Sequence, residues 1–352
     1  MFTRMTSANK LAIFILTGFL MLLISGTGNA CRMSAAIGVN LPDGMLFNHL
    51  RGDPTNFLNA LYYLAPSNPS GWGIGYYPHF GDMPTIPRGQ PMAQNDSQFT
   101  ATVNAINSSE PQIVMAHIRL ATGGCVNVPD PHPFYRDKIG KRWLFEHNGN
   151  ANKDNLINLM SSSTYLADNP PNGSDIPECA TSVVGSEIYF LYLLKNIEEN
   201  GWNVVNGAVV AIKAMIANST GSINFIMSDG KTVWAFRRGV DSLHRLFYLY
   251  NLADGYAALA SAYPSRYQDN WIEMTEYQLI VLHAGAAPVV INDVRTYCPG
   301  DINGDKQVNT ADLATLAGNF GLSGSGGDFD FDGDVDGADV AAMIAAYGKV
   351  CP

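Results

Sequence analysis

An internal repeat near the C-terminus limits the fold of this chain more than any other feature of its sequence. The segment that starts at Asp301 reappears 27 residues later at Asp328, with oxygen-bearing side chains at positions 1, 3, 5, 9 and 12 of both copies. A backbone carbonyl at position 7 completes each set. The positions that provide these oxygen atoms are Asp301, Asn303, Asp305, Gln307, Asn309 and Asp312 in the first copy and Asp328, Asp330, Asp332, Asp334, Asp336 and Asp339 in the second.

This spacing is that of an EF-hand-type loop, which surrounds a calcium ion with hard ligands, and we therefore expect two structural Ca²⁺ ions. Position 12 is aspartate in both copies, where the standard loop has glutamate. Position 6 is Gly333 in the second copy but Lys306 in the first, which predicts a weaker first site. A unit this small depends on its ions and on a covalent clasp to stay folded.

Apolar residues at helical spacing follow each loop and predict two short helices that share one small core. These residues are Leu313, Leu316, Ala317 and Phe320 after the first loop and Val340, Met343, Ile344 and Tyr347 after the second.

The N-terminus has the pattern of a secretory signal peptide. Arg4 and Lys10 supply positive charge, an apolar run follows, and small residues up to Ala30 offer a cleavage site that would make Cys31 the first residue. A membrane anchor is the first alternative, but the run is shorter than the roughly 20 residues that span a bilayer. An acylated lipoprotein is the second, although such sites usually have leucine where this chain has Gly28.

The chain has five cysteines, so at least one stays unpaired in an oxidising compartment. Cys298 and Cys351 occur in the similar contexts Tyr-Cys-Pro and Val-Cys-Pro at the two ends of the repeat, which predicts a clasp between them. Pairing of Cys125 with Cys179 is a looser expectation. If both pairs form, Cys31 keeps a free thiol.

The body of the chain alternates strand-like and helix-like segments. Strands are expected at 112–118, 222–227, 232–236 and 278–283, and helices at 154–160 and 186–200. Asp229-Gly230 is a strong hairpin signal between the second and third of these strands.

An N-terminal cysteine combines a thiol that can attack a carbonyl with an α-amine whose pKa of about 7.7 to 8 suits a general base. Amide cleavage also needs donors for the developing oxyanion, which the Asn148 amide and the Gly149 N–H could supply. Arg119, after a strand that looks buried, could bind a substrate carboxylate through two hydrogen bonds.

Several segments appear in the order found in one enzyme family. They are Cys31-Arg-Met, Gly71-Trp-Gly-Ile-Gly, His117-Ile-Arg-Leu-Ala-Thr, His132-Pro-Phe, His147-Asn-Gly and Asn224-Phe-Ile-Met-Ser-Asp-Gly, with Trp271 before a final strand. Residues 31–296 thereby resemble the class II glutamine amidotransferase domain of the N-terminal nucleophile hydrolases, particularly its stand-alone bacterial branch.

This resemblance implies an α+β fold, a four-layer αββα sandwich with two sheets between layers of helices. It also implies that Cys31 forms a γ-glutamyl thioester, that Asn148 and Gly149 hold the oxyanion, and that Arg119 with Thr122 binds the α-carboxylate. One departure stands out, because the family usually has an Asp-Ser-Glu-like triplet whose aspartate binds the substrate's α-amine. Here the run is Gly185-Ser-Glu187. Either Glu187 takes that role or the substrate is another amide.

The segment 297–352 resembles a dockerin, the calcium-dependent module that attaches enzymes to cohesin domains of scaffolding or surface proteins. By that resemblance, four small residues at loop positions 10 and 11 help to select the cohesin. They are Thr310, Ala311, Gly337 and Ala338.

The combined expectation is a signal peptide at 1–30, an amidohydrolase at 31–296 and a dockerin at 297–352. The protein would be secreted or held at a bacterial cell surface, where it hydrolyses glutamine or γ-glutamyl amides without a catalytic cofactor. Hydrolysis is expected rather than transfer because no synthase domain follows. A formal net charge of -10 disfavours nucleic-acid binding. The alternatives are a related cysteine-first acylase for other linear amides and a non-catalytic binding subunit.

Overall fold

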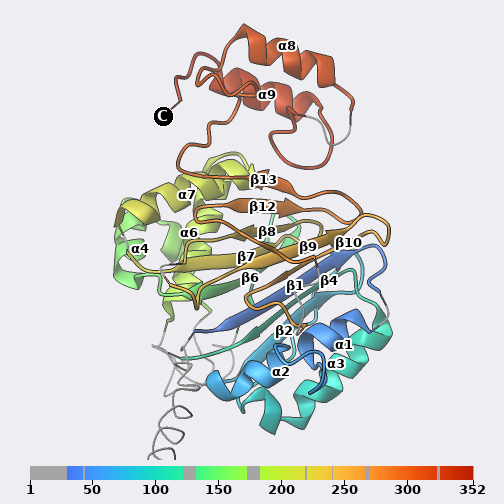
Figure 1. Cartoon of the computed structure of the whole chain (residues 1–352). Coiled ribbons are helices and arrows are strands. Elements are labelled where there is room, and N and C mark those ends of the chain that lie inside the picture. Colours follow the sequence, from blue (N-terminus) through green and yellow to red (C-terminus); the bar gives the residue numbers. More distant parts are fainter. Residues whose placement is uncertain are drawn as a thin grey trace, which may run out of the picture.

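Two antiparallel β-sheets stacked face to face form the centre of the fold (Figure 1). The computed structural model describes residues 30–42, 44–121, 132–172, 183–218, 220–239, 241–265, 270–322 and 326–351. Within these ranges, sheet A has the order β11 (Ile272–Glu273), β9 (Phe247–Asn251), β10 (Tyr256–Ala260), β1 (Arg32–Gly38), β4 (Ile113–Ile118), β2 (Trp72–Tyr77) and β3 (Arg88–Gly89). Sheet B has the order β13 (Val289–Ile291), β12 (Leu279–Leu282), β8 (Val233–Phe236), β7 (Ile223–Ser228), β6 (Lys141–Gly149) and β5 (Phe134–Lys138).

Both faces of the central strands are buried, which explains their nearly continuous apolar sequences. In β1, Met33 packs between the sheets while Ala36 faces the helices on the outer side of sheet A. In β6, Leu144 packs between the sheets while Trp143 and Phe145 face the helices over sheet B. Three apolar layers therefore hold the body together.

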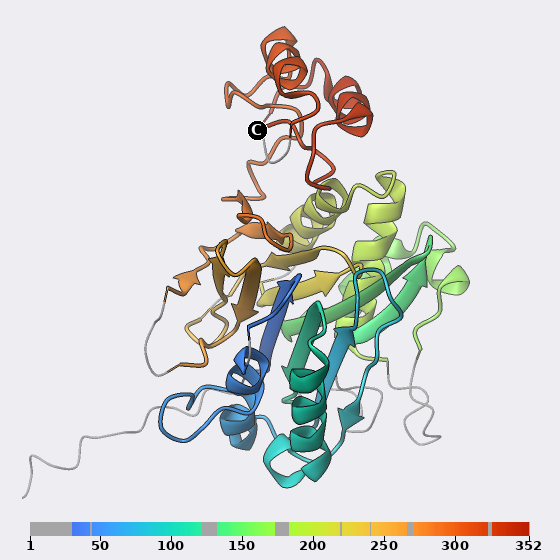
Figure 2. The same ribbon diagram turned by 90° about the vertical axis from the view of Figure 1, so that its right-hand side faces the viewer.

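Helices cover the outer face of each sheet (Figures 1 and 2). Sheet A carries α1 (Met45–Leu50), α2 (Leu61–Leu64) and α3 (Ser97–Ser109), with the short 3₁₀ helices η1 (Ala65–Ser67) and η2 (Ala93–Asn95). Sheet B carries α4 (Lys153–Met160), α6 (Gly185–Glu199) and α7 (Val204–Asn218), and α5 (Tyr165–Asp168) follows α4 in the chain. The predicted α+β class with two sheets between helical layers is confirmed.

The predicted elements of the body agree with the structure to within about a residue at each end. The hairpin at Asp229-Gly230 is confirmed, because Ser228 of β7 lies opposite Val233 of β8 and Gly230 has a φ of 90°. That positive φ suits glycine, which has no side chain to clash with the following backbone.

A disulfide between Cys298 and Cys351 closes the C-terminal segment, as the sequence predicted. Inside it, α8 (Thr310–Asn319) and α9 (Gly337–Ala346) begin at the ends of the two acidic loops. Asp312 and Asp339 each accept backbone N–H groups of their own loop as part of a capping box, so the loop and the helix start are tied together.

The expectation that the apolar residues of these two helices are buried together in one small core is only partly correct. Leu316 and Met343 are buried in the small core, and Val340 packs against it. Five others expected in that core are exposed on the surface: Leu313, Ala317, Phe320, Ile344 and Tyr347. Their spacing is helical, but two ten-residue helices have too little facing surface to bury every apolar position.

The C-terminal segment lies beyond the β13 edge of sheet B and contacts the body through its second loop (Figure 1). Phe331 of that loop is buried in the apolar layer formed by sheet B and its helices. The Asn203 side chain donates a hydrogen bond of 2.6 Å to the Phe329 carbonyl, and Lys213 of α7 donates one of 3.1 Å to the Tyr297 carbonyl. The segment is therefore anchored on the body and not only joined to it by the chain.

Some predictions fall outside the described residues. These include the signal peptide before Ala30, the pairing of Cys125 with Cys179, and Thr122. The boundaries after residues 30 and 296 stay predictions. Among the described helices, none combines the length and apolar character that a membrane span requires.

Candidate active site

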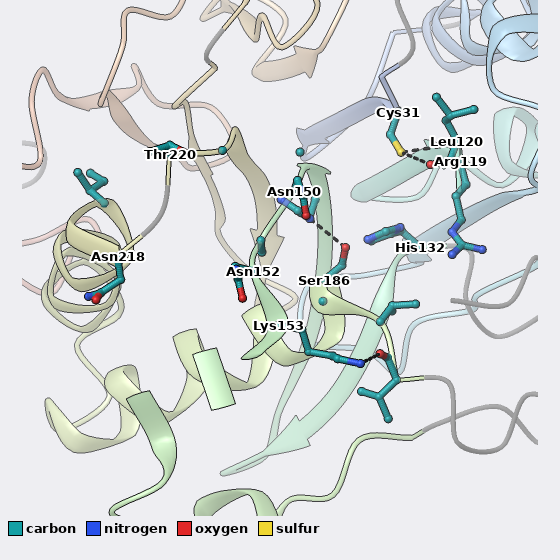
Figure 3. A pocket seen from close by; sticks show the side chains of 18 of the residues that line it. Cys31, Arg119, Leu120, His132, Asn150, Asn152, Lys153, Ser186, Asn218 and Thr220 are labelled. Carbon is teal, nitrogen blue, oxygen red and sulfur yellow. Dashed lines mark hydrogen bonds between the residues drawn. The ribbon is translucent and has the colours of Figure 1, made fainter. Parts of the chain in front are cut away.

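A cavity of about 760 Å³ opens where strands of the two sheets end and α4 and α6 begin (Figure 3). Its size is in the range of small-molecule sites. The described residues that line it are Cys31, Arg119, Leu120, His132, His147, Gly149, Asn150, Ala151, Asn152, Lys153, Val183, Val184, Gly185, Ser186, Ile216, Ala217, Asn218, Thr220 and Gly221.

Cys31 immediately precedes β1 and presents its thiol to this cavity. It is the one free cysteine among the described residues. Its Sγ accepts a hydrogen bond of 3.3 Å from the Leu120 N–H and lies 3.5 Å from the Leu120 carbonyl. Burial raises the pKa of the Cys31 thiol, against the lowering effects of the Leu120 N–H and of the charges of Arg119 and Arg32. The resting thiol therefore keeps its proton near neutral pH, and a base must remove it.

Arg119 follows β4, the neighbour of β1, and its side chain is buried at the cavity wall. The register places Ile118 opposite Arg32, so Arg119 comes next to the start of β1 and to Cys31. Their proximity accounts for the lowering effect of the Arg119 charge on the thiol pKa. The structure thus brings two of the predicted site residues to one wall.

Gly149 ends β6 and lines the cavity with its backbone. Its φ is 151°, and a Cβ atom at this position would lie 2.0 Å from the Ser222 carbonyl oxygen. Both facts require glycine here, because any larger residue would have to displace β7. The requirement fits the predicted use of this backbone as an oxyanion donor.

Asn148 precedes Gly149 on β6, and its side chain is fully buried. Neither its Nδ2 nor its Oδ1 has a hydrogen-bond partner within the described part of the chain. An unpaired buried amide costs about 1 to 3 kcal/mol of stability. Asn148 is not among the residues that line the cavity, although its neighbour Gly149 is.

Three buried histidines surround this region. The rings of His117 and His132 lie with their centroids 4.2 Å apart at a tilt of 37°, and His147 Nδ1 lies 2.9 Å from the Ser186 hydroxyl. Burial lowers the pKa of His117 and His147 to about 3 and the pKa of His132 well below its usual value. They are neutral at physiological pH and too weakly basic to hold a thiol proton, so none of them is suited to act as the base.

Glu187 does not lie at the cavity as one sequence interpretation expected. Its carboxylate accepts hydrogen bonds of 2.9 Å from Arg136 and 2.6 Å from the Asn172 N–H. That interpretation is corrected accordingly, because a buried carboxylate already paired with an arginine is a poor partner for a substrate ammonium. Gly185 does line the cavity, and a Cβ there would lie 2.6 Å from the Ala151 carbonyl oxygen, so the backbone at 151 fills the space of a side chain.

Sequence reasoning missed the wall made by the beginnings of α4 and α6. Asn152 caps α4 by accepting the Asn155 N–H, and Lys153 is the first residue of that helix. An asparagine before an amphipathic run is a helix-start signal that could have been read. The sequence could not show that the start of α4 lines the same cavity as Cys31, because α4 and β1 lie in different layers of the fold. None of Gly71–Gly75 lines the cavity, and Gly73 instead packs against the His132 backbone.

The two acidic loops of the C-terminal segment form a separate candidate site, for metal ions. The carboxylates of Asp301, Asp305 and Asp312 gather within 4.8 Å of one another, and those of Asp328, Asp330 and Asp332 do the same. In the second loop the Asp328 Oδ1 is buried without a hydrogen-bond partner. An unpaired carboxylate oxygen inside a group of carboxylates suits a hard cation such as Ca²⁺.

Comparison with known proteins matches most of the body to one family. The family of glutamine amidotransferases class-II matches residues 57–253, a range that contains Arg119, Asn148 and Gly149 and begins after Cys31. An uncharacterized protein of Methanocaldococcus jannaschii, MJ1515, is 30% identical over 54% of this chain and 49% of its own length. A putative glutamine amidotransferase of Haemophilus influenzae is 30% identical over 37% of this chain and 40% of its own.

The chain thus spans about half the length, or less, of these two relatives. Among solved structures, the allosteric regulatory enzyme of purine biosynthesis has a TM-score of 0.51 at 15% identity, covering 77% of this chain and 52% of that one. A glutamine aminotransferase class-II domain protein from Silicibacter pomeroyi has a TM-score of 0.45 at 18% identity, covering 74% of this chain and 98% of that one. The family match extends over more than half of the sequence, and the chain belongs to the glutamine amidotransferases class-II.

Proposed function

We propose that the chain is an amidohydrolase that cleaves glutamine or γ-glutamyl amides, with Cys31 as its N-terminal nucleophile. The observation that supports this most is that the Cys31 thiol, the Gly149 backbone and the Arg119 side chain line one cavity. These are the nucleophile, an oxyanion donor and a carboxylate ligand that the reaction needs.

The proposed reaction has two stages. The Cys31 sulfur attacks the amide carbon, the oxyanion is held by the Asn148 amide and the Gly149 N–H, and the C–N bond breaks to leave a thioester. The thiol proton passes to the departing amine. Water then attacks the thioester, which releases the acid and restores the thiol.

The α-amine of Cys31 is the proposed carrier of that proton. Burial keeps the thiol protonated, and the neighbouring histidines are too weakly basic to accept its proton. A free α-amine, with a pKa of about 7.7 to 8, has the required basicity. The proposal therefore includes removal of residues 1–30, since the amine exists only when Cys31 is the first residue.

We also propose that the C-terminal segment is a dockerin that binds two Ca²⁺ ions and a cohesin domain, and that the protein is secreted or held at the bacterial cell surface. The clustered carboxylates, the clasp between Cys298 and Cys351 and the exposed apolar positions of α8 and α9 support it. Exposed apolar residues on a small module are typical of a binding surface.

A related acylase for other linear amides is the second candidate. It is favoured by the Glu187–Arg136 ion pair, which leaves no role for Glu187 as a ligand of a free α-ammonium. A panel of glutamine, γ-glutamyl amides and N-acylated amines separates the two candidates by the substrates consumed.

The decisive experiment for the proposed function is N-terminal analysis of the secreted protein, followed by labelling with a thiol-reactive glutamine analogue. We expect a protein that begins at Cys31, a single label on that residue, and loss of hydrolysis in Cys31→Ser with an unchanged melting temperature. A blocked or longer N-terminus, or a Cys31→Ser variant that behaves like the original protein in every assay, would leave only a binding subunit.

A further inference from the structure

The charges around the active-site cavity are one-sided. Its described lining includes two cationic side chains, Arg119 and Lys153, and no aspartate or glutamate. The two cations come from different layers of the fold, since Arg119 follows β4 of sheet A and Lys153 begins α4 in the helical layer over sheet B. Cys31 at the end of sheet A and Gly149 at the end of sheet B belong to the layers between the outer helices.

Backbone groups add to this positive potential. The N-terminal ends of α4 and α6 both contribute to the lining, through Asn152 and Lys153 and through Gly185 and Ser186. A helix N-terminus carries a partial positive charge and unpaired N–H groups. The first turn of α6 has no side-chain cap, so no capping side chain occupies the N–H groups at its start.

A buried polar group on the same wall also lacks a partner. The His132 ring is 4% exposed, lines the cavity, and has neither nitrogen hydrogen-bonded within the described residues. Figure 3 shows the ring between Cys31 and Lys153 in that view. An unpaired ring at a cavity wall is a site for a further polar contact with a bound molecule.

Lys153 is free to meet a ligand. Its side chain is exposed, and its Nζ donates one long hydrogen bond of 3.4 Å to the Val183 carbonyl. No carboxylate of the described residues forms an ion pair with it, whereas Lys141 and Lys195 have such partners. Replacing the hydrogen bond to the Val183 carbonyl with one to a ligand carboxylate would therefore cost little free energy.

The cavity also has room for more than glutamine. Glutamine has only ten heavy atoms, and pockets of this volume commonly hold much larger ligands. If the carboxylate of the glutamyl part lies at Arg119 and the reacting carbonyl lies between Cys31 and Gly149, space remains beyond Gly149 toward the start of α4. The leaving amine of the inferred substrate would occupy this part of the cavity.

We infer, on the basis of the proposed function, that the substrates are γ-glutamyl amides whose leaving amine carries its own carboxylate, as in a γ-glutamyl amino acid. Lys153 and the helix starts bind this second carboxylate, and Arg119 binds the first. The sulfur–carbon bond forms, the C–N bond breaks, and the thiol proton goes to the amino acid, which leaves as a neutral amine with its carboxylate. Water then hydrolyses the thioester to glutamate.

The test compares two amides that differ by one carboxylate, γ-glutamyl-glycine and γ-glutamyl-ethylamide, with glutamine as the reference. We expect kcat/KM to be about fivefold higher for γ-glutamyl-glycine, the ratio expected for one exposed ion pair, and to fall toward the ethylamide value as salt is added. In Lys153→Met the ratio should approach one, and Lys153→Arg should restore it. The matched control is Lys231→Met, an exposed lysine outside the cavity, which should leave both rates unchanged.

The outcomes separate the inference from the function on which it rests. Equal rates for the two amides in the original protein, or a preference that survives Lys153→Met, would overturn the inference while hydrolysis itself stands. If a protein that begins at Cys31 consumes none of the three compounds, the proposed function fails and the inference fails with it.

Discussion

Replacing Asn148 with leucine should make the protein more stable and nearly inactive at once. The side chain is fully buried, and both its Nδ2 and its Oδ1 lack partners within the described residues. Leucine has a similar branched shape but needs no hydrogen bonds, so Asn148→Leu removes a desolvation cost of about 1 to 3 kcal/mol. Removal of one oxyanion donor lowers kcat by about 10² to 10³.

A neighbouring asparagine provides the control. Asn224 lies opposite Asn148 in the pairing of β6 with β7 and is equally buried. Its Nδ2 donates 2.8 Å to the His244 carbonyl, and its Oδ1 accepts 2.8 Å from the Arg238 N–H. Asn224→Leu therefore orphans two backbone groups and should lower the free energy of unfolding by a similar amount.

Urea unfolding followed by circular dichroism measures both variants, in the presence of calcium and alongside hydrolysis of the best substrate. The midpoint should rise for Asn148→Leu and fall for Asn224→Leu, with equal slopes. Two results would refute the reasoning. A destabilised Asn148→Leu protein would mean that the amide has a partner in the folded state, and an active one would mean that it is not an oxyanion donor.

Two further predictions concern pH and the C-terminal clasp. The pKa of His117 and of His147 is about 3 in the folded chain, against about 6.5 unfolded, so the unfolded chain binds protons first as the pH falls. The contribution of these neutral rings to the free energy of unfolding is complete above pH 6.5 and should be lower by roughly 2 kcal/mol for each ring at pH 5. Urea unfolding curves that do not move between pH 7.5 and pH 5 would contradict this. The disulfide joins residues 53 positions apart, so the Cys298→Ser/Cys351→Ser variant should lose about 4 kcal/mol of module stability and need more free calcium to stay folded. Calcium titration followed by near-ultraviolet circular dichroism measures this. An unchanged titration would show that the clasp is dispensable.

The strands, the hairpin and the clasp could be read from the sequence because local patterns determine them. The short apolar runs of β7 and β8 and the Asp229-Gly230 turn are properties of neighbouring residues. The cysteine contexts at 298 and 351 identified a long-range pair only because the repeat marks both ends of the segment.

Features that depend on packing between distant segments could not be read in the same way. The carboxylate of Glu187 is held by Arg136, 51 residues earlier, and nothing near Glu187 in the sequence indicates that partner. The apolar stripe after each acidic loop predicted helices correctly, but not which apolar residues stay exposed, because that depends on the area of the facing helix. The sequence did not indicate Lys153 as a residue of the site for a similar reason, because its place there depends on how α4 packs beside the end of β6.

The insertion of Phe331 into the body has a geometric consequence for any protein that holds the C-terminal module. A module on a free tether would let the body of the chain rotate freely, so that its cavity faced every direction in turn. Because the Phe331 ring is buried in the body, the orientation in which a partner binds the module determines the direction in which the cavity opens. A scaffold that bound many such chains would therefore present their cavities in one common orientation.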